Sequence, residues 1–217
     1  MQLDTAAIAA ADTVRAMIVD GRLVDGARVN EVKLASALGV SRTPLREALS
    51  RLAAEGALDA RPRLGFFVRP LAVTEFEQLY DLRPLLDPEA LRLGGLPSPG
   101  TLARLGRMNA TLGARVGSAA LAHDDAWHLE LVAACPNRIL LEMIQHVMSR
   151  TRRYELALMR EARHVAVAAA DHGAILDALS AGDLEAACAA LKQNLENGKA
   201  PILDWLGARG TGKGTKR

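Results

Sequence analysis

The hydrophobic residues near the amino terminus recur every three or four positions. This period is that of an amphipathic helix, so a helix is predicted over residues 5–20. Gly21 and Gly26 then interrupt the pattern and are expected to end the helix. The apolar residues that recur at this spacing are Ile8, Ala11, Val14 and Ile18.

Two shorter helices are predicted next from their start and stop signals. Asn30 can cap the first of them, and Gly39 ends it. Ser41 or Thr43 can cap the second, which ends at Gly56, a candidate left-handed cap. Both helices have one apolar face, formed by Leu34, Ala35 and Leu38 in the first and by Leu45, Ala48, Leu49 and Leu52 in the second.

A small hairpin is predicted after the third helix. Leu58–Ala60 and Phe66–Val68 have the composition of strands, and the five residues between them include a proline and a glycine. Two short helices joined by a glycine turn and followed by a hairpin are typical of a winged helix-turn-helix. Residues 1–70 are therefore predicted to form a DNA-binding domain.

The remaining chain has helical periodicity and no strand pattern. Residues 71–206 are predicted to form an antiparallel six-helix bundle, which makes the fold class mainly α. Pro84 and Pro88 are expected to kink or shorten its first helix. The tail, residues 207–217, has little to bury and is predicted to be disordered. The six helices are expected at roughly 74–93, 99–116, 119–134, 137–160, 162–180 and 183–197.

Charge and composition narrow the class of protein. The 217 residues carry a formal net charge of only +2, so overall charge does not indicate a nucleic-acid partner. The segment from Arg42 to Arg69, however, contains six arginines and only three acidic residues, which predicts a local basic surface. Cys135 and Cys188 are isolated and are predicted to be buried thiols. No apolar run is long enough to span a membrane, and charged residues interrupt the first stretch, where a signal peptide would lie. A cytoplasmic location is therefore expected.

The start of the third helix is the candidate DNA-reading element. Its outward side chains include Arg42, Thr43 and Arg46, at the end where a recognition helix carries its base-reading groups. Arg42 and Arg46 lie one turn apart, so one can reach a guanine edge and the other a phosphate. Arg61 and Arg63 can supply charge at the hairpin. The alternative is an ordinary three-helix bundle with a solvated arginine face.

Three polar residues and an amide form a candidate metal site in the helical domain. Asp124 and His128 are four residues apart and share one helix face. His172 precedes the turn at Asp183 by eleven residues and Asn194 follows it by eleven, so an antiparallel hairpin brings them level. Such a set can hold a divalent metal ion with positions left open. The alternatives are a hydrogen-bonded core histidine and a helix-surface ion pair.

The amino-terminal motifs resemble the GntR family of bacterial regulators. The segment from Leu38 to Leu49, which contains Ser-Arg-Thr-Pro-Leu-Arg, carries most of this resemblance. Gly21-Arg22-Leu23, Leu34-Ala35, Leu52, Glu55-Gly56 and Gly65 add to it. The resemblance implies that the DNA contacts fall on Ser41, Arg42, Thr43, Arg46 and Gly65.

The second domain resembles the FCD effector domain of the FadR-type branch of that family. The two resemblances together cover about nine-tenths of the chain. Metal-binding members use an Asp, a His four residues later and two further histidines that are 22 residues apart. Asp124, His128 and His172 match this pattern, whereas Asn194 stands where the last His is expected. A zinc-, nickel- or manganese-type ion is implied. The matching motifs are Leu79-Tyr80-x-Leu82-Arg83, Asp124-x-x-x-His128, Asn137-x-x-Leu140, His172-x-x-Ile175-x-x-Ala178, Gly182-Asp183 and Ala186-Ala187.

The resemblance also implies a function. A homodimer is expected to bind double-stranded operator DNA, most members being repressors that an effector releases. Arg83 is the family's arginine in the first effector-domain helix and can pair with a small carboxylate effector, or else form a surface salt bridge. His123, His146 and His164 match no site pattern and are interpreted as solvent or interface residues. Two alternatives stay open: a metal-free ligand-binding regulator, and a metal-dependent hydrolase with Glu130 as the base.

Overall fold

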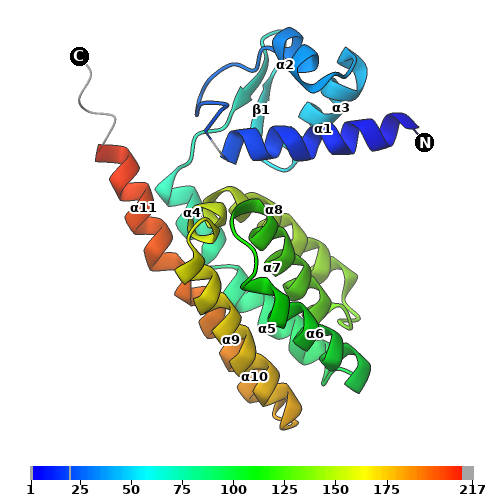
Figure 1. Cartoon of the computed structure of the whole chain (residues 1–217), viewed down its shortest axis with the longest axis vertical. Helices are drawn as coiled ribbons and strands as arrows, with labels where there is room; N and C mark the ends of the chain where they lie inside the picture. Colours follow the sequence, from blue (N-terminus) through cyan, green and yellow to red (C-terminus); the bar gives the residue numbers. More distant parts are fainter. Residues whose placement is uncertain (1, 20, 212–217) are drawn as a thin grey trace. The chain divides into compact units, whose positions relative to one another are not determined.

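A computed structural model describes residues 2–19 and 21–211 of the chain. It divides into two compact units, Met1–Leu71 and Ala72–Arg217, each with its own buried core (Figure 1). None of the described helices is both long enough and apolar enough to cross a membrane. The helices and the small sheet confirm the expected class, a winged helix-turn-helix followed by a helical bundle.

The first unit is a three-helix arrangement with a two-stranded wing. α1 packs against α3, and one core is formed by apolar residues of all three helices and both strands. The strands pair antiparallel, with Leu58 opposite Val68. Residues 26–29 form further backbone hydrogen bonds with the second strand, so the wing is attached to the loop before the second helix. The elements are α1 (Gln2–Val19), α2 (Glu31–Leu38), α3 (Arg42–Ala54), β1 (Leu58–Arg61) and β2 (Gly65–Val68).

Local signals account for the helix ends in this unit. The Asn30 side chain accepts a hydrogen bond from the Lys33 backbone N–H at 3.0 Å and so caps α2. Gly39 ends α2 with a left-handed φ of 64°, which a residue without Cβ adopts at little cost. Ser41 occupies the N-cap position of α3 without a side-chain capping bond. Asn30 therefore sets the start of α2, and Gly39 rather than the serine sets the turn between α2 and α3.

The second unit is an antiparallel helical bundle. α9 and α10 form a hairpin, α5 packs between α10 and α8, and α7 packs against α6 and α8. Figure 1 shows α9 and α10 running side by side. The elements are α4 (Val73–Tyr80), α5 (Arg83–Gly94), α6 (Pro99–Leu112), α7 (Gly117–Val132), α8 (Arg138–Met159), α9 (Ala162–Ser180), α10 (Leu184–Asn197) and α11 (Lys199–Thr211).

Two expectations for this unit need correction. The first expected helix, 74–93, is two helices, because Pro84 lacks an N–H and its ring collides with the carbonyl four residues earlier. α4 therefore ends at Tyr80, and Pro84 lies in the first turn of α5, where prolines are tolerated. At the other end, residues 207–211, expected to be disordered, continue α11. The rest of the expected disordered tail, residues 212–217, lies outside the described residues.

Candidate nucleic-acid interface and candidate metal centre

The start of α3 presents a polar face to solvent. Pro44 and Leu45 are buried in the core of the first unit, whereas Arg42, Thr43 and Arg46 are exposed. The buried and the exposed residues lie on different faces of α3, because residues one helical turn apart share a face. Packing of the apolar side against α1 thus fixes the direction in which the two arginines project.

A groove of about 430 Å³ lies between the start of α3 and the wing. Arg46 contacts Glu31 across it, with Nε 3.2 Å from Oε2, while 65% of the Arg46 side chain stays exposed. Such a surface ion pair contributes only about 0–1 kcal/mol, so Arg46 can exchange Glu31 for another anion. Arg28, which no sequence motif indicated, is brought to this groove by the pairing of residues 26–29 with β2. The groove is lined by Arg28, Glu31, Arg46, Arg61, Arg63 and Gly65, among others.

The wing is ordered by contacts of its own residues. The guanidinium carbon of Arg61 lies 4.1 Å from the centroid of the Phe67 ring, in cation–π geometry. Gly65 has a φ of 92°, a conformation that other residues rarely adopt. A Cβ at this position would also lie 3.5 Å from Glu31 Oε1. The wing therefore holds its arginines on a fixed turn beside α3.

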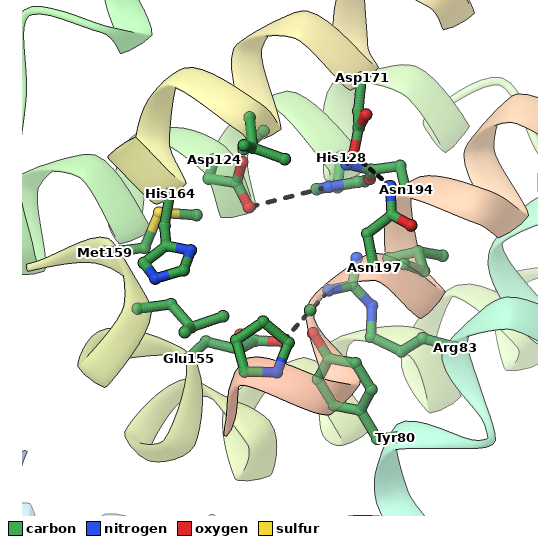
Figure 2. A pocket seen from close by; sticks show the side chains of 16 residues that line it. Tyr80, Arg83, Asp124, His128, Glu155, Met159, His164, Asp171, Asn194 and Asn197 are labelled. Carbon is green, nitrogen blue, oxygen red and sulfur yellow. Dashed lines mark hydrogen bonds and ion pairs between the residues drawn. The ribbon is translucent and has the colours of Figure 1, made fainter. Parts of the chain in front are cut away.

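The second unit contains a partly enclosed cavity of about 80 Å³ (Figure 2). One wall is polar and carries residues of α5, α7 and α10, among them Arg83, Asp124, His128 and Asn194. The other walls come from α4, α8, α9 and the start of α11. The labelled side chains in Figure 2 that were not expected at a site are Tyr80, Glu155, Met159, His164, Asp171 and Asn197.

Asp124, His128 and His172 converge beside this cavity. One possible ligand atom of each lies within 4.8 Å of the other two, and all three side chains are buried. His172 Nε2 is 3.4 Å from Asp124 Oδ1, and His128 Nε2 is 3.8 Å from Asp124 Oδ2. Trp127 stacks on the His172 ring at a centroid distance of 3.7 Å and donates its indole N–H to the Leu105 carbonyl. The tryptophan thus holds the His172 ring in place.

Burial makes this cluster neutral. It lowers the pKa of His172 to about 3 and the pKa of His128 well below its ordinary value, with Arg83 adding to both shifts. Burial also raises the pKa of Asp124 to about 8. The close His–Asp contacts are therefore not ion pairs, since the imidazoles stay uncharged.

The cluster fits a divalent metal ion. Asp124 Oδ1, His128 Nδ1 and both ring nitrogens of His172 are buried and have no hydrogen-bond partner among the described residues. Buried polar atoms without partners are rare, and each costs about 1–3 kcal/mol. Two neutral imidazoles and a carboxylate are ligands that zinc-type ions accept, and binding of a cation would lower the pKa of Asp124 again.

Asn194, the fourth expected ligand, lines the same cavity from α10. Its side-chain N–H donates to Asp171 Oδ2 at 3.4 Å, and Asn197 donates to the same oxygen at 2.8 Å. The α9–α10 hairpin thus places Asn194 next to the residue that precedes His172. The role of Asn194 as a fourth metal ligand stays a prediction.

Arg83 is buried at the cavity and is not a surface salt bridge. Only 4% of it is exposed, and its guanidinium donates to Asp87 Oδ2 at 2.8 and 3.2 Å. Its third nitrogen lies 3.7 Å from Glu155 Oε1. Burial raises the pKa of Glu155 to about 7, although Arg83 lowers it. Arg83 and Glu155 therefore face each other at the cavity wall, and Glu155 is only partly ionised near neutral pH.

Glu155 and Asp171 line the cavity but were not expected there from the sequence. Glu155 lies on α8, far in sequence from the other cavity residues, and belongs to no motif. Asp171 was missed although it adjoins His172, which was a usable signal. His164 lines the cavity and the outer groove and is partly exposed, so its interpretation as a solvent or interface residue stays a prediction. The same interpretation stays a prediction for His146, which is exposed, and for His123, whose Nε2 lies 2.7 Å from the Met108 carbonyl.

Comparisons with known protein families match both units. Residues 78–197 match the FCD domain family, and residues 7–68 match the gntR family of bacterial regulatory proteins. The Nta operon transcriptional regulator of Aminobacter aminovorans is 49% identical over 77 residues, 36% of this chain and 37% of that protein. The chain thus spans little more than a third of the length of that relative. An HTH-type transcriptional regulator in an unstable DNA locus of Streptomyces ambofaciens is 29% identical over 195 residues, 84% of this chain and 78% of that protein.

Solved structures share the fold. E. coli McbR/YncC superposes with a TM-score of 0.75 at 23% identity, covering 93% of this chain and 98% of that chain. A GntR-family transcriptional regulator of Pseudomonas syringae pv. tomato DC3000 superposes with a TM-score of 0.55 at 27% identity. That match covers 96% of this chain and 89% of the other. Both similarities extend over the two units.

Proposed function

Because the chain belongs to the gntR family of bacterial regulatory proteins and carries an FCD domain, we propose that it is a homodimeric, effector-released repressor. The observation that carries the proposal is the exposed, arginine-bearing start of α3 beside an arginine-bearing wing. The proposed partner is a pseudo-palindromic double-stranded operator, because a two-fold symmetric dimer presents two such helices.

The proposed DNA contacts divide into two kinds. Arg42, Thr43 and Arg46 enter the major groove, where an arginine can bind a guanine edge through two hydrogen bonds. Ser41 and the wing residues Arg61, Arg63 and Gly65 meet the sugar-phosphate backbone, which adds affinity without sequence information. The groove between α3 and the wing supports this division, because it is lined by arginines from both elements.

The test is operator binding by a pair of arginine variants of α3. Arg46→Ala is expected to weaken binding to the DNA upstream of the protein's own gene by about 1–3 kcal/mol. Arg51→Ala is the matched control, because Arg51 is also exposed but lies in the last turn of the helix. Equal affinities of wild type and Arg46→Ala in a titrated gel shift would contradict the proposal for this residue.

The proposed effector is a small carboxylate bound in the cavity of the second unit. Asp124, His128 and His172, with the amide oxygen of Asn194, would hold a zinc-, nickel- or manganese-type ion. When bound, such an ion supplies a Lewis-acidic centre for a carboxylate oxygen. Arg83 would orient the carboxylate by a charge-assisted hydrogen bond, in competition with Glu155.

α8 provides a route from the cavity to the start of the second unit. Glu155 faces the cavity, and its neighbour Tyr154 is bonded to both backbone groups of Ala72, with each contact at 3.3 Å. Glu75, three residues further along, is paired with Arg153 of the same helix. An effector that displaces Glu155 from Arg83 would shift α8 and, through Tyr154, would shift Ala72, the first residue of the second unit. Its effect on DNA binding equals its differential affinity for the two arrangements.

A thermal-shift screen of carboxylic acids, with and without chelator, tests the effector site. One acid is expected to stabilise the protein only without chelator and to release it from operator DNA. Stabilisation that survives chelation would instead support the metal-free regulator. The hydrolase alternative is not maintained, since the relatives are transcription regulators. Glu130, its proposed base, is paired with Arg104 on another surface.

A further inference from the structure

The effector cavity is polar at one end and apolar at the other. Arg83, His128 and Asn194 form the polar end, whereas Met159 and His164 lie on the opposite side (Figure 2). The side chains around Met159 come from the end of α8, the first half of α9 and the start of α11. They are Leu158, Met159, Val167, Ala168 and Pro201. A ligand whose carboxylate lies near Arg83 therefore directs the rest of its structure toward apolar walls.

A second hollow adjoins the apolar end. This groove of about 570 Å³ shares Leu158, His164, Val167 and Pro201 with the cavity, so the two spaces lie side by side. Trp205 and Ala157 extend its apolar surface. Charged residues surround it, with Arg163 paired to Glu161 at 2.7 Å and Asp204 on α11. An apolar channel with a charged rim is the arrangement expected around the tail of an amphipathic ligand.

The sizes of the two spaces support one ligand that occupies both. Small-molecule sites usually measure roughly 300–1,000 Å³. The inner cavity, about 80 Å³, lies well below this range, whereas the groove, about 570 Å³, lies within it, so a ligand larger than a small acid needs the groove as well. Val167 is 51% exposed at the junction of the two spaces. A single exposed valine is ordinary, but here it belongs to a contiguous apolar surface that begins inside the protein.

We propose that the effector is an amphipathic carboxylate with a hydrocarbon or aromatic tail. Its carboxylate lies at the polar end of the cavity, and its tail passes Leu158, Val167 and Pro201 to reach the groove beside Trp205. The inference rests on the proposed function and adds the chemical class of the effector. A peptide or a second copy of the chain fits less well, because the groove leads into a narrow, polar, buried end.

The test is a series of straight-chain acids: acetate, butanoate, hexanoate and octanoate. Each methylene that the channel buries adds about 0.8 kcal/mol, which is roughly a fourfold gain in affinity. Binding of each acid to the full-length protein is measured by calorimetry. Affinity is expected to rise by this factor for each added methylene while the tail stays within the channel. Octanoate, but not acetate, is also expected to change the fluorescence of Trp205, a change that Trp205→Phe removes.

Val167→Glu separates the tail site from the carboxylate site. It places a charge at the junction of the cavity and the groove. It is expected to abolish the gain in affinity of hexanoate and octanoate over acetate, while acetate binds as in the wild type. Val116→Glu is the control, because Val116 is similarly exposed, at 55%, but lies outside both hollows. Its chain-length series should match that of the wild type.

The outcomes distinguish this inference from the proposed function. Wild-type affinity that does not increase from acetate to octanoate would overturn the amphipathic effector but leave a small carboxylate effector intact. Equal weakening of acetate and octanoate by Val167→Glu would also overturn it. If the acids bind with the expected chain-length dependence but none alters operator binding, the amphipathic site stands and the effector-released repressor does not.

Discussion

At the scale of single residues, the cavity is controlled by buried charge. Arg83 is bonded to Asp87 and lies close to Glu155, so one buried cation faces two acidic groups. Asp125, which raises the pKa of Glu155, and Arg152, which lowers it, belong to the same environment. Glu155 is therefore held between protonated and charged states near neutral pH, and the charge of the cavity depends on it.

Glu155→Gln is expected to change how stability depends on pH. In the wild type the pKa of Glu155 is about 7 in the folded protein and near 4.5 when it is unfolded. Between these values the folded state retains a proton that the unfolded state releases, so stability falls as pH rises. Glutamine does not titrate and avoids this loss, which amounts to roughly 3 kcal/mol. Urea unfolding of both proteins with chelator, from pH 4 to 8, measures the difference; a constant difference would contradict the prediction.

His172→Ala is expected to remove the response to chelator. A metal ion at a hundred times its dissociation constant stabilises the folded state by about 2.7 kcal/mol. Chelation should therefore lower the melting temperature of the wild type by roughly 5–10 °C. The variant should melt at the same temperature with and without chelator. His146→Ala, at an exposed histidine, should respond like the wild type. A variant that still loses stability on chelation would place the metal elsewhere.

At the scale of elements, helix breaks build the cavity. Pro84 separates α4 from α5 and so places Tyr80 and Arg83 on different helices that both reach the cavity. Near the carboxyl end of the described chain, α10 and α11 meet at Gly198, against which the Tyr80 ring packs. The φ of Gly198 is −73°, so the position needs a glycine for space and not for backbone conformation.

Two glycine-to-alanine variants test this junction. A Cβ at Gly198 would overlap the Tyr80 hydroxyl oxygen, so Gly198→Ala is expected to destabilise the protein by about 1–3 kcal/mol. Gly173, inside α9, has open space around its Cβ position. Gly173→Ala should therefore stabilise by about 0.5–1 kcal/mol, the helix preference for alanine. Urea unfolding compares the two. Equal effects would mean that the packing of Tyr80 on Gly198 has no energetic role.

At the scale of the whole molecule, charge is local rather than global. The chain carries 27 basic and 25 acidic residues. The groove between α3 and the wing nevertheless gathers Arg28, Arg46, Arg61 and Arg63 around one acidic residue, Glu31. Attraction to a phosphate backbone should therefore arise from this groove, and from helix α3 beside it.

The salt dependence of operator binding tests this view. Each phosphate contact contributes about 0.9 to the slope of log affinity against log salt concentration. Arg61→Ala should reduce that slope by about one and weaken binding to all DNA sequences similarly. Arg138→Ala removes the same charge from an exposed position on α8 and should leave the slope unchanged. If both variants reduced the slope equally, global charge would be responsible.

The sequence by itself determined the features that depend on neighbours within a few residues. Asn30 and Gly39 define α2 because capping and left-handed turns are local, and the spacing of Asp124 and His128 places them on one helix face. Tertiary structure alone decided which distant residues share the cavity. Glu155 reaches Arg83 only because α8 packs on α5, and Arg28 reaches the wing only through strand pairing. Such docking depends on the shapes of whole faces, which no periodicity along the chain encodes.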